Sequence, residues 1–359
     1  RKFLDTGGWF HLVIRVDTTQ STAADRIRVY VNGVQETSFS ATNYPGQNDN
    51  YIYSESITAQ YIRQRADQGN TSSFDGIMSH IHWTDGYSYD ASSFGSTDST
   101  TGEWKINTAP SVTYGTNGYF ILKDGNSVTD QSGNSNNFTV TGTLTNTEDC
   151  PSNNFAVLNE VQRTNSNTTF QYGATEHYSN TNWLGAVSSL GASAGKFYAE
   201  AKITDKDNFS FGVCMSNGNT FANLNTANVN RVGRYDDGWG WDGNGAGSAQ
   251  KLHNNSATSL GSEFSNNDIA MVAVDVTNGK VWFGKNGTWF GSGNPSAGTY
   301  AAFDSISFTN SVHFMSGSET GRIQWNFGNG FFGTSAIASE GSNASGNGKF
   351  EYDVPTGFT

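Results

Sequence analysis

The chain of 359 residues is acidic, with a formal net charge of -12, and combines 42 glycines with 13% aromatic residues. Only 14% of residues are charged, which argues against a coiled coil, and the aromatic content argues against disorder. No cluster of Lys and Arg is present, so the composition disfavours nucleic acid and anionic membranes as partners. No apolar run reaches transmembrane length, so membrane insertion is not expected.

The first residues predict an antiparallel meander. WFHLVIRVDTT (9–19) and RIRVYV (26–31) read as strands, and Asn32-Gly33 supplies the following turn. The chain opens almost directly into a strand, and a sandwich that begins here lacks its first strands. We therefore expect the first module to be incomplete at its N-terminus.

A further strand is predicted in IMSHIHW (77–83), and DASSFG (90–95) reads as a single capped turn. His80 and His82 lie two residues apart on this strand, so they share a face and could make half of a metal site. No third ligand is evident, and we expect the solvent face of the strand to hold them.

Several of these segments occur in a characteristic order. WFHLVIRVDTTQ, RVYVNG, FDGIMSHIHWTDG, DASSFGSTDSTTGEW, YGTNGYFILKD, DQSGNSNNFT and CPSNNFAVLN together resemble the laminin-G/concanavalin A-like region of virion proteins from tailed phages, especially marine ones. The resemblance covers roughly residues 3–160. The sequence departs from the pattern of that family at His80, where an acidic residue is expected.

A calcium site is one reading of the segment that follows. Asp124, Asn126 and Asp130 place hard oxygen ligands close together, as Ca²⁺ prefers. Thr129 stands where the loop of an EF-hand needs its glycine, so the ion would be a structural staple. No other cofactor is expected.

A second meander is predicted over residues 269–290. Val272, Val274 and Val276 alternate with Ala273 and Asp275, the period of a strand with one buried face. Asn278-Gly279 suits a type I′ turn into the next strand, and Asn286-Gly287 turns the chain again.

From residue 195 the sequence resembles an SPRY (B30.2-like) domain. KFYAEAKI, FSFGVCM, RVGRYDDGWGWDGNG, KLHNN and IQWNFGN carry the resemblance, and KVWFGKNGTWFGSGNPSAGT is its most diagnostic part. The expected fold is therefore all-β, with two concanavalin A-like antiparallel β-sandwich (jelly-roll) modules. We place part of a laminin-G-like sandwich in residues 1–110, connecting strands in 111–160 and an SPRY-like sandwich in 161–359.

The best candidate for a ligand site lies in YDDGWGWDGN. Its aromatic rings can stack on sugars while its oxygens accept hydroxyl protons, a mixture that suits glycan binding. The alternative is that Trp239 and Trp241, two apart on one strand, face the core together. The candidate residues are Tyr235, Asp236, Asp237, Trp239, Trp241, Asp242 and Asn244.

No catalytic site is recognisable. A glucanase on this fold needs three carboxylates at Glu-x-Asp-x-x-Glu spacing, and the nearest match, Glu351-Tyr352-Asp353, has Thr356 at the third. We read this segment as a polar C-terminal edge strand. Cys150 and Cys214 form no metal pattern, and the sequence does not say whether they pair.

These observations and resemblances predict a non-catalytic virion surface protein, a phage tail fibre or appendage, located on the particle surface. Expected partners are host cell-surface glycans, other virion proteins and further copies of the chain in a homo-oligomer. Two alternatives stay open: purely structural decoration of a capsid or tail, and a polysaccharide-degrading enzyme whose catalytic residues lie outside this segment.

Overall fold

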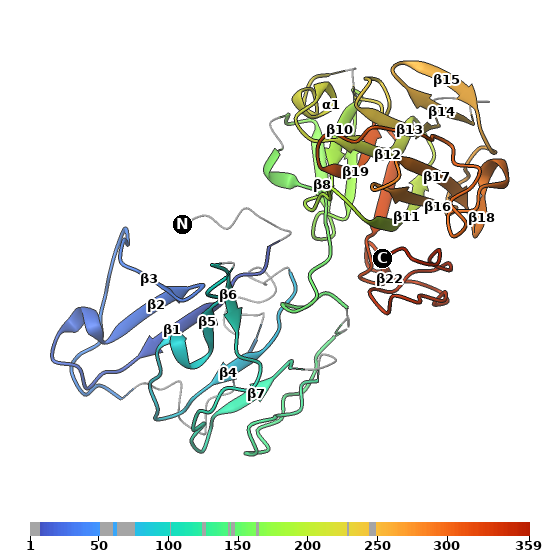
Figure 1. Ribbon diagram of the computed structural model, residues 1–359. Helices are drawn as coiled ribbons and strands as arrows, with labels where there is room; N and C mark the ends of the chain where they lie inside the picture. Colours follow the sequence, from blue (N-terminus) through green and yellow to red (C-terminus); the bar gives the residue numbers. More distant parts are fainter. Residues whose placement is uncertain are drawn as a thin grey trace. The chain divides into compact units, whose positions relative to one another are not determined.

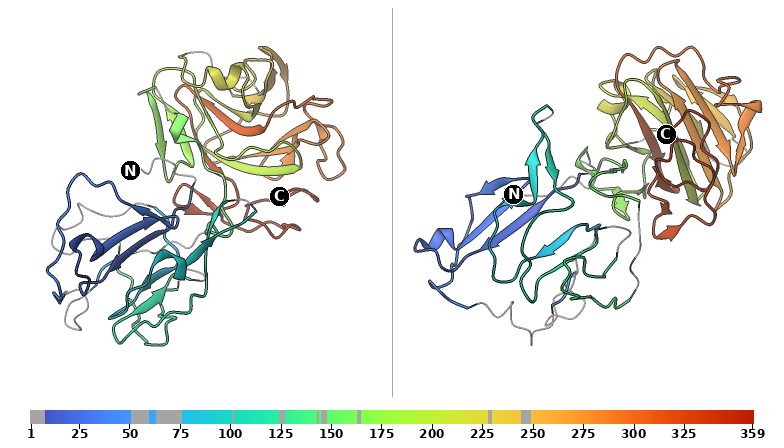
Figure 2. Two further views of the ribbon diagram at one scale, coloured as in Figure 1. Left: turned by 60° about the vertical axis from the view of Figure 1, so that its left-hand side comes forward. Right: turned by 60° about the horizontal axis from the view of Figure 1, so that its bottom comes forward.

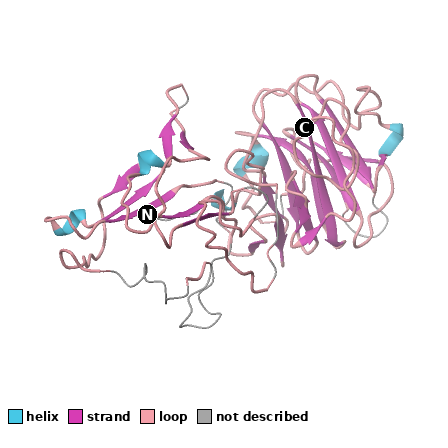
Figure 3. Ribbon diagram, turned by 90° about the horizontal axis from the view of Figure 1, so that it is seen from below, coloured by secondary structure: helices cyan, strands magenta, loops and turns pink. Residues whose placement is uncertain are grey.

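The computed structural model describes residues 8–50, 60–62, 76–100, 102–123, 127–142, 144, 148–162, 165–227, 230–243 and 249–359. The chain divides into two compact units, one built mainly from residues 9–146 and the other from residues 153–359. Nearly all regular structure is β, as predicted, and the few helical turns are short (Figure 3). In the described part of the chain, no helix has the length and apolarity needed to cross a bilayer.

The second unit is an antiparallel β-sandwich whose strands can be followed in Figure 1. One sheet has six strands in the order β10-β19-β12-β13-β14-β15, and the other has seven in the order β18-β17-β16-β11-β20-β9-β8. Aromatic and branched side chains from both sheets fill the space between them, including Phe211, Trp241 and Phe283.

The strands of this unit are β8 (Thr168–Gln171), β9 (Glu176–Ser179), β10 (Leu184–Val187), β11 (Lys196–Asp205), β12 (Phe209–Met215), β13 (Gly238–Asp242), β14 (Gln250–His253), β15 (Ser256–Ser259), β16 (Ile269–Asp275), β17 (Lys280–Lys285), β18 (Thr288–Trp289), β19 (Val312–Ser318) and β20 (Arg322–Asn326), followed by a small hairpin of β21 (Phe331–Phe332) and β22 (Ser335–Ala336). The helical pieces are η5 (Glu160–Gln162), α1 (Asn219–Ala222) and η6 (Phe290–Ser292).

The predicted second meander is present, but one of its turns differs from the prediction. Asn286 and Gly287 both have positive φ, 48° and 81°, and join Lys285 to its partner Thr288 as a two-residue hairpin loop. The Asn278-Gly279 turn is not type I′. Asp275 pairs with Lys280 across a four-residue loop in which only Gly279 has positive φ, because Asn278 donates instead to the Asp275 carboxylate.

Strand β16 is buried on both faces, whereas its alternation predicted one exposed face. Val272 and Val274 face the core between the sheets, while Met271 and Ala273 belong to a second buried cluster on the outer face. The C-terminal segment, residues 349–359, covers that outer face with Phe350, Val354 and Phe358. The predicted polar edge strand at Glu351-Tyr352-Asp353 is therefore wrong, because this segment is a loop that packs on the sheet.

Glu200, in the middle of β11, anchors this covering segment. Its side chain is fully buried and accepts hydrogen bonds from the backbone N–H of Glu351 and of Tyr352, each at 2.8 Å. The hydroxyl of Tyr198 donates a third bond at 2.8 Å. Burial outweighs these donors and raises the pKa of Glu200 to about 7.

The first unit consists of small antiparallel sheets rather than a full sandwich. Its sheets are β1-β2-β3, β4-β7 and β5-β6, and Figure 2 shows them from two further directions. Their strands are β1 (Leu12–Val16), β2 (Ile27–Val31), β3 (Val34–Glu36), β4 (Ile81–Trp83), β5 (Gly95–Thr97), β6 (Trp104–Ile106) and β7 (Tyr119–Ile121), with the helical turns η1 (Ala23–Asp25) and η4 (Ala91–Ser93).

The segment expected to connect the modules, residues 111–160, divides between the two units. Strand β7 pairs with β4 in the first unit, while Phe155, Val157 and Leu158 are buried in the second. The turn at Asn32-Gly33 is a two-residue loop with φ values of 48° and 76°, as its sequence suggests.

The two histidines of the predicted half metal site have different environments. His82 stacks on Phe120 with ring centroids 3.9 Å apart, and its Nδ1 lies 2.9 Å from the Tyr114 hydroxyl. Burial lowers the pKa of His82 to about 3, so the ring is neutral. His80 has a φ of 51° and precedes the strand. The expectation of a shared solvent face is therefore wrong for His82, which packs among aromatic rings.

The raised pKa of Glu200 predicts a pH-dependent stability. Between pH 4.5 and about 7 the unfolded chain has released this proton while the folded chain retains it, so stability falls as pH rises through this window. We expect wild type to lose about 3 kcal/mol relative to Glu200→Gln across it. Urea unfolding of both proteins at several pH values measures the difference. If the difference in unfolding free energy between the two proteins does not change with pH in this window, Glu200 is ionised throughout it.

His177 predicts the opposite dependence. It is fully buried, its Nε2 has no hydrogen-bond partner among the described residues, and burial lowers its pKa to about 3. Below pH 6.5 the imidazole of His177 binds a proton in the unfolded chain but not in the folded chain, so stability falls as pH drops. We expect His177→Gln to resist acid better than wild type by up to about 5 kcal/mol. The measurement is urea unfolding of both proteins at several pH values below 6.5. Equal losses of unfolding free energy in the two proteins as pH drops would contradict the prediction.

Candidate functional site

An open groove lies at one end of β12 in the second unit. It has a volume of about 440 Å³ and is lined by Met215, Asn217, Gly218, Asn219, Ala222, Asp236 and Asp237. The loop that begins after Met215 and runs into α1 forms one wall, and the turn before β13 forms the other. This volume falls in the range of small-ligand sites.

Asp237 holds the two walls of the groove together. Its buried carboxylate accepts hydrogen bonds from the backbone N–H and the hydroxyl of Thr220, in the first turn of α1. Its own carbonyl accepts the backbone N–H of Met215 at 2.8 Å. Residue 218 is glycine because a β-carbon there would overlap the Asp237 carboxylate. Asp237 is therefore a positioning residue.

Asp236 and the two asparagines are the polar groups that a ligand can reach. Asp236, Asn217 and Asn219 are exposed, and Met215 adds a half-buried thioether at the groove. Asn217 has a φ of 63°, a left-handed conformation that asparagine tolerates better than most residues. A carboxylate and two amides give the groove an excess of acceptors together with amide donors.

The two tryptophans of the predicted ligand segment are in the core. Trp241 is 1% exposed and stacks on Phe211 with centroids 5.6 Å apart, and Trp239 is 5% exposed and stacks on His253. The alternation that we weighed as the alternative explains this placement, because both rings point to the facing sheet. Rings enclosed in this way do not offer a face to a sugar.

The remaining residues of that segment separate. Asp242 is fully buried and pairs with Arg231, whose guanidinium lies over the Trp183 ring. Tyr235 is half-buried beside the groove-lining pair, and its carbonyl accepts the N–H of Gly238 at 3.3 Å. Asn244 lies outside the described residues. Of the seven predicted residues, the groove brings together Asp236 and Asp237.

The predicted calcium ligands are described only in part. Asp124 and Asn126 lie outside the described residues, so the site stays a prediction. Asp130 already has donors on both oxygens: Oδ1 accepts the N–H of Phe120 and of Ser132, and Oδ2 accepts the Ser132 hydroxyl and the N–H of Asn136. These bonds lower the pKa of Asp130 against the opposing effect of burial. Its visible role is to organise its loop.

The described residues that line the groove include no histidine, cysteine, serine or lysine. Burial raises the pKa of the Cys214 thiol, next to Met215, so the sulfur stays protonated and unreactive. Cys150 and Cys214 are both free. Within the described ranges, no group of three or more His, Cys, Asp or Glu is placed to hold a metal ion.

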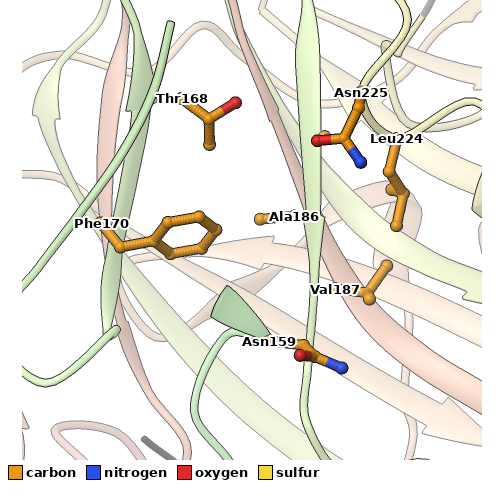
Figure 4. Close-up of a pocket in the computed structure, with 8 residues that line it drawn as sticks. Asn159, Thr168, Phe170, Ala186, Val187, Leu224 and Asn225 are labelled. Atoms are coloured by element: carbon orange, nitrogen blue, oxygen red, sulfur yellow. The ribbon is translucent and has the colours of Figure 1, made fainter. Parts of the chain in front are cut away.

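A second cavity lies at β10, an edge strand of the six-stranded sheet (Figure 4). Its volume is about 10 Å³, close to the minimum for one water molecule. Its apolar lining residues are Phe170, Ala186, Val187 and Leu224, and its polar ones are Asn159, Thr168 and Asn225. This cavity is too small for a ligand.

The loop wall of the groove was not predicted from the sequence. Ser216-Asn217-Gly218-Asn219 follows a strand and has the composition of a turn, which marks it as an exposed loop. That signal places the asparagines at the surface, but it does not show that Asp236 lies beside them.

Comparison with known proteins identifies part of the second unit. Residues 196–328, from the first residue of β11 to just beyond β20, match the SPRY domain family, which confirms the predicted SPRY module. No curated protein matches the chain. No comparison bears on the laminin-G-like resemblance of residues 3–160, which stays a prediction.

Solved structures similar to this chain include those of stonustoxin and of the SPRY domain of human HERC1. The structure of stonustoxin matches at 16% identity and a TM-score of 0.35, over 48% of this chain and 27% of stonustoxin. The SPRY domain of human HERC1 matches at 16% identity and a TM-score of 0.34, over 44% of this chain and 91% of that domain. The chain thus spans about a quarter of the length of stonustoxin.

Asp237 and Asp236 form a matched pair for mutation. We expect Asp237→Ala to destabilise the protein by about 1–3 kcal/mol, because the buried donors of Thr220 lose their acceptor. Asp236→Ala, at an exposed position, should change stability by less than about 0.5 kcal/mol. Urea unfolding of both variants tests this. Equal losses of unfolding free energy in the two variants would show that Asp237 does not hold the walls together.

Proposed function

We propose that this chain is a non-catalytic surface protein of a tailed-phage virion, part of a tail fibre or appendage, and that it attaches the particle to glycans on the host cell. The observation that carries the proposal is the open, polar groove of about 440 Å³, whose lining residues include no paired acid and base and no reactive nucleophile. Such a groove suits recognition rather than catalysis.

The lining chemistry favours a sugar. Hydroxyl groups both donate and accept hydrogen bonds, and the amides of Asn217 and Asn219 can do the same, while Asp236 accepts. Met215 and Ala222 offer small apolar surfaces to sugar C–H groups. Apart from Met215 at the end of β12, the ligand would contact residues of α1 and of the loops, since the other residues of β12 and those of β13 are buried.

Two further observations support the wider proposal. SPRY domains are typically non-catalytic interaction modules, which agrees with the unreactive groove. The ordered motifs of residues 3–160 resemble a region of tailed-phage virion proteins, which suggests the particle surface as the location and other virion proteins as neighbours. Weak binding at single sites becomes effective when several copies act together.

A protein ligand is the second candidate. It is favoured by the SPRY match, because the SPRY domain is a protein-interaction module. A polar loop of a partner protein would use the same asparagine amides and Asp236. Structural decoration without a ligand, and polysaccharide cleavage by residues outside this segment, are the remaining alternatives.

A glycan array with the full chain tests the proposal. We expect selective binding to a small set of glycans, and we expect Asp236→Ala to weaken it at least tenfold, about 1.4 kcal/mol, through the lost acceptor. The matched control is Glu263→Ala, which removes an exposed carboxylate outside the groove and should bind as wild type does.

The other outcomes separate the alternatives. A silent array combined with capture of peptides from a random library, lost in Asp236→Ala, would replace the glycan with a protein ligand. Silence in both assays would favour decoration. Release of new reducing ends from host polysaccharide would contradict the non-catalytic assignment.

A further inference from the structure

Two structural requirements place an asparagine before a glycine in the loop wall of the groove. Residue 217 has a φ of 63°, a left-handed conformation that asparagine tolerates better than most residues. Residue 218 is glycine because a β-carbon there would overlap the Asp237 carboxylate. The pair Asn217-Gly218 therefore follows from the way this loop is built.

An Asn-Gly pair can lose its side-chain amide without an enzyme. The backbone nitrogen of the glycine attacks Cγ of the asparagine, and the new C–N bond closes a succinimide ring. The Cγ–Nδ2 bond breaks, and Nδ2 leaves as ammonia with the proton of the glycine N–H. Water then opens the ring at either carbonyl and gives aspartate or isoaspartate. Ring closure requires an asparagine side chain that is free to turn towards this nitrogen, and a glycine without a β-carbon leaves the approach open.

Most of the Asn-Gly pairs in this chain are restrained by hydrogen bonds. The sequence holds eight such pairs, of which Asn244-Gly245 lies outside the described residues, so seven remain. In six of the seven, a hydrogen bond holds the asparagine side chain. These six are Asn32, Asn117, Asn278, Asn286, Asn329 and Asn347. Exposure alone does not separate them from Asn217, because Asn278 and Asn286 are exposed as well.

The side chain of Asn217 differs from the other six in having no such restraint. It is exposed and makes no hydrogen bond in the part of the chain that the structure describes. Within the same ranges, the backbone nitrogen of Gly218 also donates to no acceptor. Both reacting groups of this pair are therefore free to meet.

We propose that Asn217 is a modification site, at which the folded protein converts asparagine to aspartate and isoaspartate ahead of its other described Asn-Gly pairs. A side chain held by a hydrogen bond has to break that bond before it turns towards the glycine nitrogen. Asn217 has no such bond to break. The restrained pairs thus keep their amides while the groove changes.

The conversion alters the hydrogen-bonding groups of the groove. It replaces an amide, which donates and accepts, with a carboxylate that only accepts. The groove then carries two exposed carboxylates, one at residue 217 and one at Asp236. Isoaspartate also adds a methylene to the main chain of the loop wall. For a glycan ligand, a step that rests on the proposed function, the lost donor and the added negative charge weaken binding as the protein ages.

Peptide mass spectrometry of the full chain, kept folded at mildly alkaline pH, tests the conversion. The change from amide to acid raises the mass of a peptide, and fragmentation distinguishes aspartate from isoaspartate. We expect Asn217 to convert at least about fivefold faster than each of the six restrained asparagines, a factor that corresponds to about 1 kcal/mol, or one hydrogen bond. Conversion of Asn217 at the rate of those six, or more slowly, would overturn the proposal.

An engineered release of a second pair tests the role of the hydrogen bond. Thr359→Val removes the hydroxyl that accepts from Nδ2 of Asn347, and it should raise the conversion rate of Asn347 about fivefold. Thr359 is exposed and its backbone bonds to Lys196 and Tyr198 do not involve the hydroxyl, so the variant should fold as wild type does. An unchanged rate at Asn347 would contradict control by hydrogen bonds.

The unfolded chain is the control for local sequence. In urea, where the hydrogen bonds of the fold are lost, all seven asparagines should convert at similar rates. A lead of Asn217 that persists in urea would assign its rate to the neighbouring residues instead of the fold, and would contradict the proposal.

Asn217→Asp tests the consequence for the groove. We expect it to bind the glycans selected on the array at least about tenfold more weakly than wild type. Asn48→Asp is the matched control, because Asn48 is also exposed with a φ of 63° but lies outside the groove. Equal binding by Asn217→Asp and wild type would overturn this consequence. A silent array would count against the proposed function, while the mass measurement decides the conversion by itself.

Discussion

The two-sided burial of the central strands β11 and β16 is the constraint on which the second unit depends. Strand β16 carries apolar side chains in both directions, and β11 adds the buried Tyr198 and Glu200 to the outer face, so both faces of their sheet have to be covered. The facing sheet covers one side, and the C-terminal segment covers the other with Phe350, Val354 and Phe358. Glu200 binds two backbone N–H groups of that segment and so fixes its position. A buried carboxylate is costly, and its three donors offset part of that cost.

The burial of the strands also explains where the groove lies. Trp239 and Trp241 are committed to the core, and Gly240 alternates with them because the carbonyl of Val232 approaches its backbone too closely for a side chain. Strands packed on both sides leave ligand contacts to the loops at their ends. Asp237 then performs a structural task, holding α1, while its neighbour Asp236 stays exposed to solvent.

The first unit buries less of its sheet. One face of the three-stranded sheet packs Val13 and Tyr30 against Ala91 and Phe94, while Leu12, Ile14, Val16 and Val34 on the other face are exposed. The aromatic group around His82 and the Asp130 loop stabilise the remainder locally.

Local pattern determined the all-β class and the Asn-Gly turns at residues 32–33 and 286–287, because alternation and turn chemistry are properties of neighbouring residues. The SPRY module came from the resemblance of its motifs to a known family, and the family match over residues 196–328 confirms it. The sequence was compatible with Trp239 and Trp241 lying either in the core or in a ligand site. The tertiary structure decided between them, since only the packing shows which residues cover each ring. It likewise covered the outer face of β16 and set Asn217 and Asn219 beside Asp236. Those pairings join residues far apart in the chain, and no local period records which distant segment will cover a given face.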